Sequence, residues 1–206
     1  MGRGTALSAI QGLIFDLDGT LVDSGLDFQA IRAEMGIPAG QPILETIEQM
    51  SEAESRRCTE ILAAHEWRGA ERAELFPGVR ATLAMLANRG YRTALLTRNS
   101  RAVVDATLAR VGLAFDSVLA REDARPKPDP LAIQILCESW QLPPARVAII
   151  GDYVFDVEAG RRAGARTVLF TRGRDLQALP FAADADFVLA SWNDARSLVR
   201  WLEQPA

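Results

Sequence analysis

The fold of this chain is decided by one stretch near its start, Ile10-Gln11-Gly12-Leu13-Ile14-Phe15-Asp16-Leu17-Asp18-Gly19. Residues 10–15 form a short apolar run, which indicates a buried strand. The run ends abruptly at Asp16, and a second carboxylate follows two residues later at Asp18. A buried strand that ends in polar residues is a pattern that recurs further along the chain.

Two later runs repeat this pattern. Residues 91–96 form an apolar run that stops at Thr97, and residues 146–150 form another that stops at Gly151-Asp152. Each run has the length and composition of a buried strand. Three further strands are predicted, at residues 115–119, 166–170 and 186–189.

The segments between these strands carry apolar residues at helical spacing. One such stripe is closed by Gly90 and another by Gly112, and glycine commonly ends a helix in this way. A third helix is predicted to begin at Pro130, because proline suits the first helical position. Strands that alternate with helices predict an α/β fold of three layers, with a Rossmann-like parallel sheet between helices.

One long segment breaks this alternation. Residues 24–75 show helical patterns and no strand, with helices expected at 27–35, at 43–50 and after Ser51 as N-cap. We therefore expect a helical cap domain at 23–75, inserted into a core domain formed by 1–22 and 76–206. The alternative is that these helices simply cover the sheet.

Composition excludes several classes of protein. The chain has 206 residues, of which 49% are hydrophobic and 24% charged, as in ordinary soluble domains and unlike disordered or fibrous chains. A net charge of −4 without a basic block argues against a nucleic-acid partner. No apolar run reaches the ~20 residues that span a membrane, and residues 1–11 lack the pattern of a signal peptide. A cytoplasmic location is expected.

The basic residues are unevenly divided. Lys127 is the only lysine among 23 basic residues, so the other 22 are arginines. Codon bias accounts for the ratio, yet a chain that uses arginine almost everywhere keeps a lysine at this position. A lysine ammonium is a compact point charge, which a planar guanidinium does not reproduce at every site.

Acidic residues gather where the strands end. Ligands of open α/β sheets bind outside the carboxyl ends of the strands, where this chain has Asp16, Asp18, Thr97, Asp152 and Asp156. Clustered carboxylates repel one another unless a cation or protons neutralise them, and Mg²⁺ is the usual cation where phosphate is the substrate. Gly19 lets backbone N–H groups approach a phosphate.

Four stretches together resemble the motifs of the haloacid dehalogenase-like hydrolase superfamily. They occur in the family's order, at residues 15–24, 95–99, 125–130 and 149–160. The details are similar to the phosphoglycolate phosphatase-like branch, which has a helical C1-type cap. One departure is Tyr153, which stands where this branch often has a small residue.

The resemblance implies a role for each matching residue. Asp16 would attack phosphorus and form an aspartyl-phosphate, Asp18 would act as general acid and base, and Lys127 would neutralise the reacting anions. Phosphate oxygens would be bound by Thr97, Arg98, Lys127 and Gly19. The site would hold Mg²⁺ through Asp16, the backbone carbonyl of Asp18, Asp152 and Asp156, the last of which supports metal waters or orients the lysine.

The resemblance predicts a Mg²⁺-dependent phosphatase that hydrolyses a small phosphorylated metabolite. Asp18 argues against a true dehalogenase, which lacks this second carboxylate. The insertion contains no lysine, which excludes the Schiff-base mechanism of phosphonoacetaldehyde hydrolases. Two alternatives stay open: a phosphosugar mutase of the β-phosphoglucomutase type, and a regulatory protein that keeps the same core only for binding.

Overall fold

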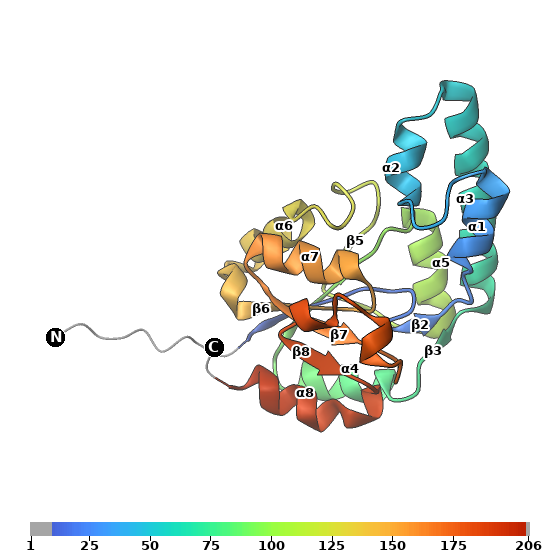
Figure 1. Cartoon of the computed structure of the whole chain (residues 1–206). Coiled ribbons are helices and arrows are strands. Elements are labelled where there is room, and N and C mark those ends of the chain that lie inside the picture. The colour runs from blue at the N-terminus through green and yellow to red at the C-terminus, as the bar shows by residue number, and fades with distance from the viewer. Residues whose placement is uncertain (1–9, 205–206) are drawn as a thin grey trace.

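The core of the computed structural model is a parallel sheet of six strands, within residues 10–204, which are those that the structure describes (Figure 1). The sheet order is β5-β4-β1-β6-β7-β8, and every neighbouring pair is parallel. The strands are β1 (Gly12–Phe15), β4 (Arg92–Leu96), β5 (Ser117–Leu119), β6 (Val147–Gly151), β7 (Arg166–Phe170) and β8 (Phe187–Leu189). All six predicted strands are confirmed, with their ends moved by no more than two residues. The predicted lack of a signal peptide concerns residues that lie mostly outside the described range.

Helices cover both faces of this sheet, which confirms the predicted three-layer α/β fold. Successive residues of a strand point to opposite faces. Phe15 accordingly packs with α4 (Val79–Asn88), α5 (Arg101–Val111) and α8 (Ala195–Leu202), whereas Ile14 packs with α6 (Leu131–Trp140) and α7 (Val154–Ala163). The described part of the core also contains four short 3₁₀ helices, at Pro144–Arg146, Leu176–Ala178, Ala182–Asp184 and Trp192–Asp194.

Helix ends follow local chemistry. Gly90 and Gly112 have positive φ angles of 77° and 62° just after α4 and α5, as predicted for terminating glycines. Pro130 differs from the prediction by one residue, since it is the N-cap of α6 and not its first helical residue. Within residues 10–204, no helix combines the length and the apolar composition needed to cross a bilayer.

The insertion consists of three helices with their own apolar cluster. These are α1 (Phe28–Met35), α2 (Ile43–Glu48) and α3 (Glu52–Arg72), and the Ser51 side chain caps α3 as predicted. Their shared cluster is formed by Ile31, Met35, Ile37, Ile43, Ile47, Cys58 and Leu62. Figure 1 shows α3 running beside α5 of the core, and the Nε of Arg110 donates a hydrogen bond to the carbonyl of Ala73 at 3.0 Å.

A short ribbon joins the insertion to the core. Strand β2 (Val22–Asp23) pairs antiparallel with β3 (Glu74–Leu75), at the points where the chain leaves the core and returns to it. The prediction that residues 24–75 contain no strand is therefore wrong at its end. A strand of two residues is too short to show an alternating pattern, so the sequence gives no signal for it.

Candidate active site

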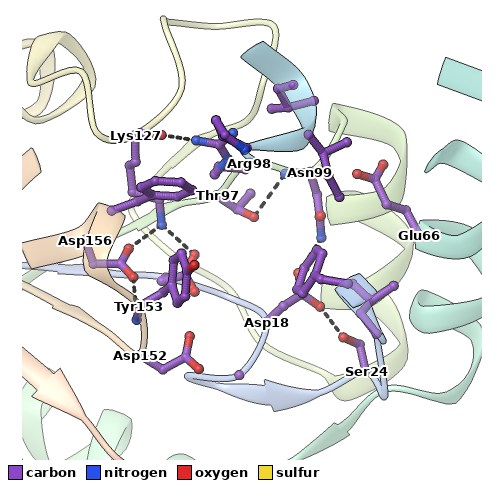
Figure 2. A pocket seen from close by; sticks show the side chains of 18 of the residues that line it. Asp18, Ser24, Glu66, Thr97, Arg98, Asn99, Lys127, Asp152, Tyr153 and Asp156 are labelled. Carbon is purple, nitrogen blue, oxygen red and sulfur yellow. Dashed lines mark hydrogen bonds and ion pairs between the residues drawn. The ribbon is translucent and has the colours of Figure 1, made fainter. Parts of the chain in front are cut away.

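The carboxyl ends of three adjacent strands form one side of a cavity of about 440 Å³ (Figure 2). Strand β1 lies between β4 and β6, so the residues that follow these strands meet at one edge of the sheet. The insertion provides the opposite wall. All eight predicted site residues line this cavity: Asp16, Asp18, Gly19, Thr97, Arg98, Lys127, Asp152 and Asp156.

Lys127 is buried between two carboxylates. Its Nζ donates to Oδ1 of Asp16 and to Oδ1 of Asp156, both at 2.6 Å, and to the carbonyl of Leu96 at 3.0 Å. Burial alone would lower the pKa of Lys127, but the two carboxylates outweigh it and raise the pKa above its usual value. The ammonium is therefore charged and fixed beside Asp16.

Three carboxylates form a group that could hold a metal ion. Asp16, Asp152 and Asp156 each offer one oxygen, and these oxygens lie within 4.8 Å of one another. Burial, with the neighbouring acids, raises the pKa of Asp16 to about 8 and that of Asp152 to about 6. Oxygen ligands crowded in this way suit a hard cation such as Mg²⁺.

Gly19 leaves room beside this group. Its φ angle is 77°, and a Cβ added there would lie 2.6 Å from Oδ2 of Asp152. Its N–H donates to the carbonyl of Val22 at 2.8 Å and so closes a turn. The role of Gly19 in binding phosphate stays a prediction.

Asp18 points away from the three-carboxylate group. One oxygen accepts a hydrogen bond from the hydroxyl of Ser24, and the other accepts from Nδ2 of Asn99 at 2.6 Å. Burial raises the pKa of Asp18, and these two hydrogen bonds oppose that effect. Its carboxylate is thus held in one orientation, outside the group that could bind a metal.

Thr97 and Arg98 differ in the hydrogen bonds that their side chains already make within the protein. Thr97 is buried at the cavity wall, where its hydroxyl accepts from the N–H of Asn99 at 3.2 Å. The Arg98 guanidinium forms two hydrogen bonds with Glu45 of α2, at 2.7 and 3.0 Å, and donates to the carbonyl of Lys127. It also lies 4.6 Å from the centre of the Phe155 ring. The side chain predicted to bind phosphate therefore links the insertion to the core.

Tyr153 lies at the rim of the cavity. Its side chain packs edge-on against Phe155 and Phe181, with ring centres 5.0 and 5.9 Å apart. Its N–H donates to Oδ2 of Asp156 at 3.1 Å, so Asp156 bridges this N–H and Lys127. Asp156 thus orients the lysine, as one of its two predicted roles requires.

Some residues that line the cavity were not predicted as site residues from the sequence. Ser24 and Asn99 stand inside the recognised motifs, but nothing in the pattern indicates that both hold Asp18. Arg172 and Arg174 follow β7 and contact Oδ2 of Asp152 at 3.0 and 3.3 Å. The rule that ligands gather beyond strand ends applies to β7 as well, and it would have found these two arginines.

Glu66 also lines the cavity without being predicted as a site residue. It is a buried carboxylate of α3, paired with Arg121. Burial raises the pKa of Glu66 from its usual 4.5 to about 7, and Arg121 opposes this shift. A helix of the insertion thus brings an acid to the cavity wall, far in sequence from the strand ends.

This pKa predicts a pH dependence of stability. Because the folded state binds the Glu66 proton more tightly than the unfolded state, the free energy of unfolding falls as the pH rises from 4.5 to about 7. We expect Glu66→Gln to reduce that fall by up to about 3 kcal/mol. Urea unfolding at a series of pH values measures it, with Glu71→Gln, an exposed site on the same helix, as control. Parallel curves for the wild type and Glu66→Gln would contradict this assignment.

Known sequences that are similar to this chain include haloacid dehalogenase-like hydrolases and phosphatases. Residues 10–164 match the family model described as haloacid dehalogenase-like hydrolase. A phosphoglycolate phosphatase of Synechococcus elongatus is 34% identical in an alignment that covers 94% of this chain and 99% of that protein. A haloacid dehalogenase-like hydrolase domain-containing protein of Arabidopsis thaliana is 32% identical over 176 residues, covering 80% of this chain and 72% of the relative.

Solved structures share the fold. A hydrolase from Pseudomonas syringae has a TM-score of 0.76 at 20% identity, covering 94% of this chain and 100% of that one. A putative β-phosphoglucomutase from Thermotoga maritima has a TM-score of 0.69 at 23% identity, covering 93% and 99% of the two chains. At this level of identity the likeness concerns architecture.

Proposed function

Because this chain belongs to the haloacid dehalogenase-like hydrolase family and is a phosphatase of that family, we propose that it hydrolyses small-molecule phosphomonoesters through an aspartyl-phosphate on Asp16. One observation carries the proposal. A buried lysine holds Asp16 on one side, and a second, separately oriented carboxylate lies two residues away at Asp18. Two carboxylates held apart in one cavity support the roles of nucleophile and general acid proposed for them.

The carboxylates of Asp16 and Asp18 have different tasks in this reaction. In the first step an oxygen of Asp16 forms a bond to phosphorus while the ester oxygen leaves with a proton from Asp18. In the second step Asp18 accepts a proton from a water whose oxygen attacks the same phosphorus, which releases inorganic phosphate and restores Asp16. Burial raises the pKa of Asp18, and this supports its role as a proton donor.

Charge stabilisation comes from the residues around Asp16. Phosphoryl transfer depends mainly on positioning and on neutralising the phosphate oxygens. Lys127 supplies a fixed positive charge next to the nucleophile, and the Thr97 hydroxyl can donate to a phosphate oxygen at the same edge of the sheet. Asp156 keeps Lys127 in place.

The same edge fits a magnesium ion. Asp16 and Asp152, with Asp156 and the backbone carbonyl of Asp18, would hold it, and the space beside Gly19 leaves room for it. When bound, Mg²⁺ supplies positive charge that offsets the repulsion between the anionic nucleophile and the anionic phosphate. We propose that residues 23–75 act as the cap that excludes bulk water from this reaction.

Magnesium is expected to stabilise the folded protein. A ligand present at about 100 times its Kd adds about 2.7 kcal/mol to the free energy of unfolding. Saturating Mg²⁺ should therefore raise the Tm of the wild type, and Asp152→Asn should abolish that rise. Thermal unfolding with Mg²⁺ and with a chelator measures the effect. Asp105→Asn on the exposed face of α5 is the control and should keep the full rise.

A panel of small phosphate esters tests the function itself. We expect Mg²⁺-dependent release of phosphate from several of them and from p-nitrophenyl phosphate. Isomerisation that depends on a bisphosphate, with slow net release of phosphate, would replace this proposal with a mutase. Failure to release phosphate from the whole panel would instead indicate a binding protein.

A further inference from the structure

Glu66 is the acidic exception on the buried face of α3. That face otherwise presents apolar or small residues, Cys58, Leu62, Gly69 and Ala70. The Glu66 side chain is only 4% exposed, yet it lines the cavity together with Leu62, one helical turn earlier. A carboxylate placed in a buried stripe needs a specific reason, because burial of a charge is unfavourable unless it is paired.

Arg121 pairs with one of the two oxygens of the Glu66 carboxylate. Nη2 of Arg121 donates to Oε1 of Glu66, while Nε of Arg121 donates to the carbonyl of Arg98 at 2.8 Å. The guanidinium therefore fixes Glu66 against the end of β4. The backbone of Ser100 lies close enough to the Glu66 carboxylate to lower its pKa, but Oε2 has no partner with hydrogen-bond geometry among the described residues.

The Glu66 side chain lines the cavity, although Oε2 itself is covered in this structure. Figure 2 shows Glu66 across the cavity from Lys127 and Asp156, with Asp18 and Asn99 between them. A substrate with its phosphate at Lys127 has room in this cavity to extend its carbon chain toward Glu66. Buried acceptors without a partner are uncommon in folded proteins, and a bound ligand is one way to satisfy them.

We propose that the Glu66 carboxylate turns Oε2 into the cavity and accepts there a hydrogen bond from the end of the substrate remote from its phosphate. The enzyme then prefers phosphomonoesters that carry a hydroxyl or ammonium donor at that end. This inference rests on the proposed phosphatase function and adds the class of substrate. Glu66 is a specificity-determining residue in this proposal, because it contacts the substrate away from the reacting atoms.

The surroundings of Glu66 favour such a donor over an anion. Arg121 is already paired with Glu66, so a substrate carboxylate at this place would have to compete with Glu66 for the same guanidinium. The wall of the same cavity includes the apolar residues Phe28, Ile43, Leu44 and Leu62, which suit a carbon chain. A neutral or cationic donor meets an acceptor here, whereas a carboxylate meets another negative charge.

Matched esters test this preference. We would measure kcat/KM of the wild type in Mg²⁺ for propyl, 3-hydroxypropyl and 3-aminopropyl phosphate, and for the corresponding five-carbon esters, which differ in reach. At one or both lengths, at least one donor ester should exceed its alkyl partner by about tenfold or more. The hydroxyl and amine arms show which donor is preferred. Equal values for all three esters at both lengths would overturn the proposal.

Two substitutions assign the preference to Glu66. Glu66→Gln can keep the contact with Arg121 through its amide oxygen, but it turns an N–H donor toward the cavity, so the donor-to-alkyl ratio should fall by about tenfold. Glu66→Asp withdraws the carboxylate by one methylene and should also lower the ratio. Glu45→Gln breaks the other ion pair between insertion and core and should leave the ratio unchanged.

The outcomes separate this inference from the proposed function. If the wild type hydrolyses neither these esters nor p-nitrophenyl phosphate, the phosphatase proposal itself is wrong. If hydrolysis proceeds and Glu66→Gln, folded by circular dichroism, keeps the wild-type ratio, only the role of Glu66 is wrong.

Discussion

Asp16→Asn will remove phosphatase activity while the protein stays folded. An amide is a poor nucleophile and forms no stable acyl-phosphate, so turnover of p-nitrophenyl phosphate in Mg²⁺ should fall by at least about a thousandfold. Asn has nearly the shape of Asp, and its side-chain oxygen can still accept from Nζ of Lys127, so the buried contacts survive. Initial rates of phosphate release, with circular dichroism of the same sample, measure both parts of this expectation.

Asp105→Asn provides the matched control for this substitution. It makes the same chemical change on the exposed face of α5 and should leave the rate unchanged. A folded Asp16→Asn protein that hydrolyses p-nitrophenyl phosphate at the wild-type rate would show that another group attacks phosphorus.

Lys127→Arg should lower kcat by at least about a hundredfold, although both residues are cationic. The Lys127 side chain is 2% exposed, and its Nζ reaches oxygens of Asp16, Asp156 and Leu96 from one point. A planar guanidinium is wider, and its donors spread into a fork that does not converge on a single centre. Inserting it into a buried site also displaces its neighbours.

Steady-state kinetics of Lys127→Arg, with thermal unfolding to confirm the fold, measures this effect. Arg92→Lys interchanges the same two residue types at an exposed position and should leave activity unchanged. Activity of Lys127→Arg within about threefold of the wild type would mean that any positive charge suffices at this position.

Much of the core and the site follows from local rules of sequence. The apolar runs of β1, β4 and β6 are bounded by sharp changes to polar residues, so the strands and the edge at which they end can be predicted. Since parallel strands align their carboxyl ends, Asp16, Thr97 and Asp152 had to lie near one another. Glycines with positive φ angles after α4 and α5 mark helix ends for equally local reasons.

Contacts between insertion and core could not be predicted in this way. Glu45 and Glu66 pair with Arg98 and Arg121, partners 53 and 55 residues further along the chain. Such pairs depend on how α2 and α3 dock against the core, and neither helical spacing nor composition specifies that geometry. For this reason the sequence does not show that Glu45 pairs with the Arg98 side chain, or that Glu66 is buried at the cavity wall.

Because Lys127 is the only lysine of the sequence and is buried, it can be labelled chemically as a probe of the cavity. Since the sequence contains no other lysine, its one side-chain amine lies inside the cavity and none lies on the surface. Reductive methylation with ¹³C-labelled formaldehyde would place a side-chain NMR label at Lys127 alone, beside Asp16 and Asp156. The rate of that labelling in the native protein would measure how often the cavity opens.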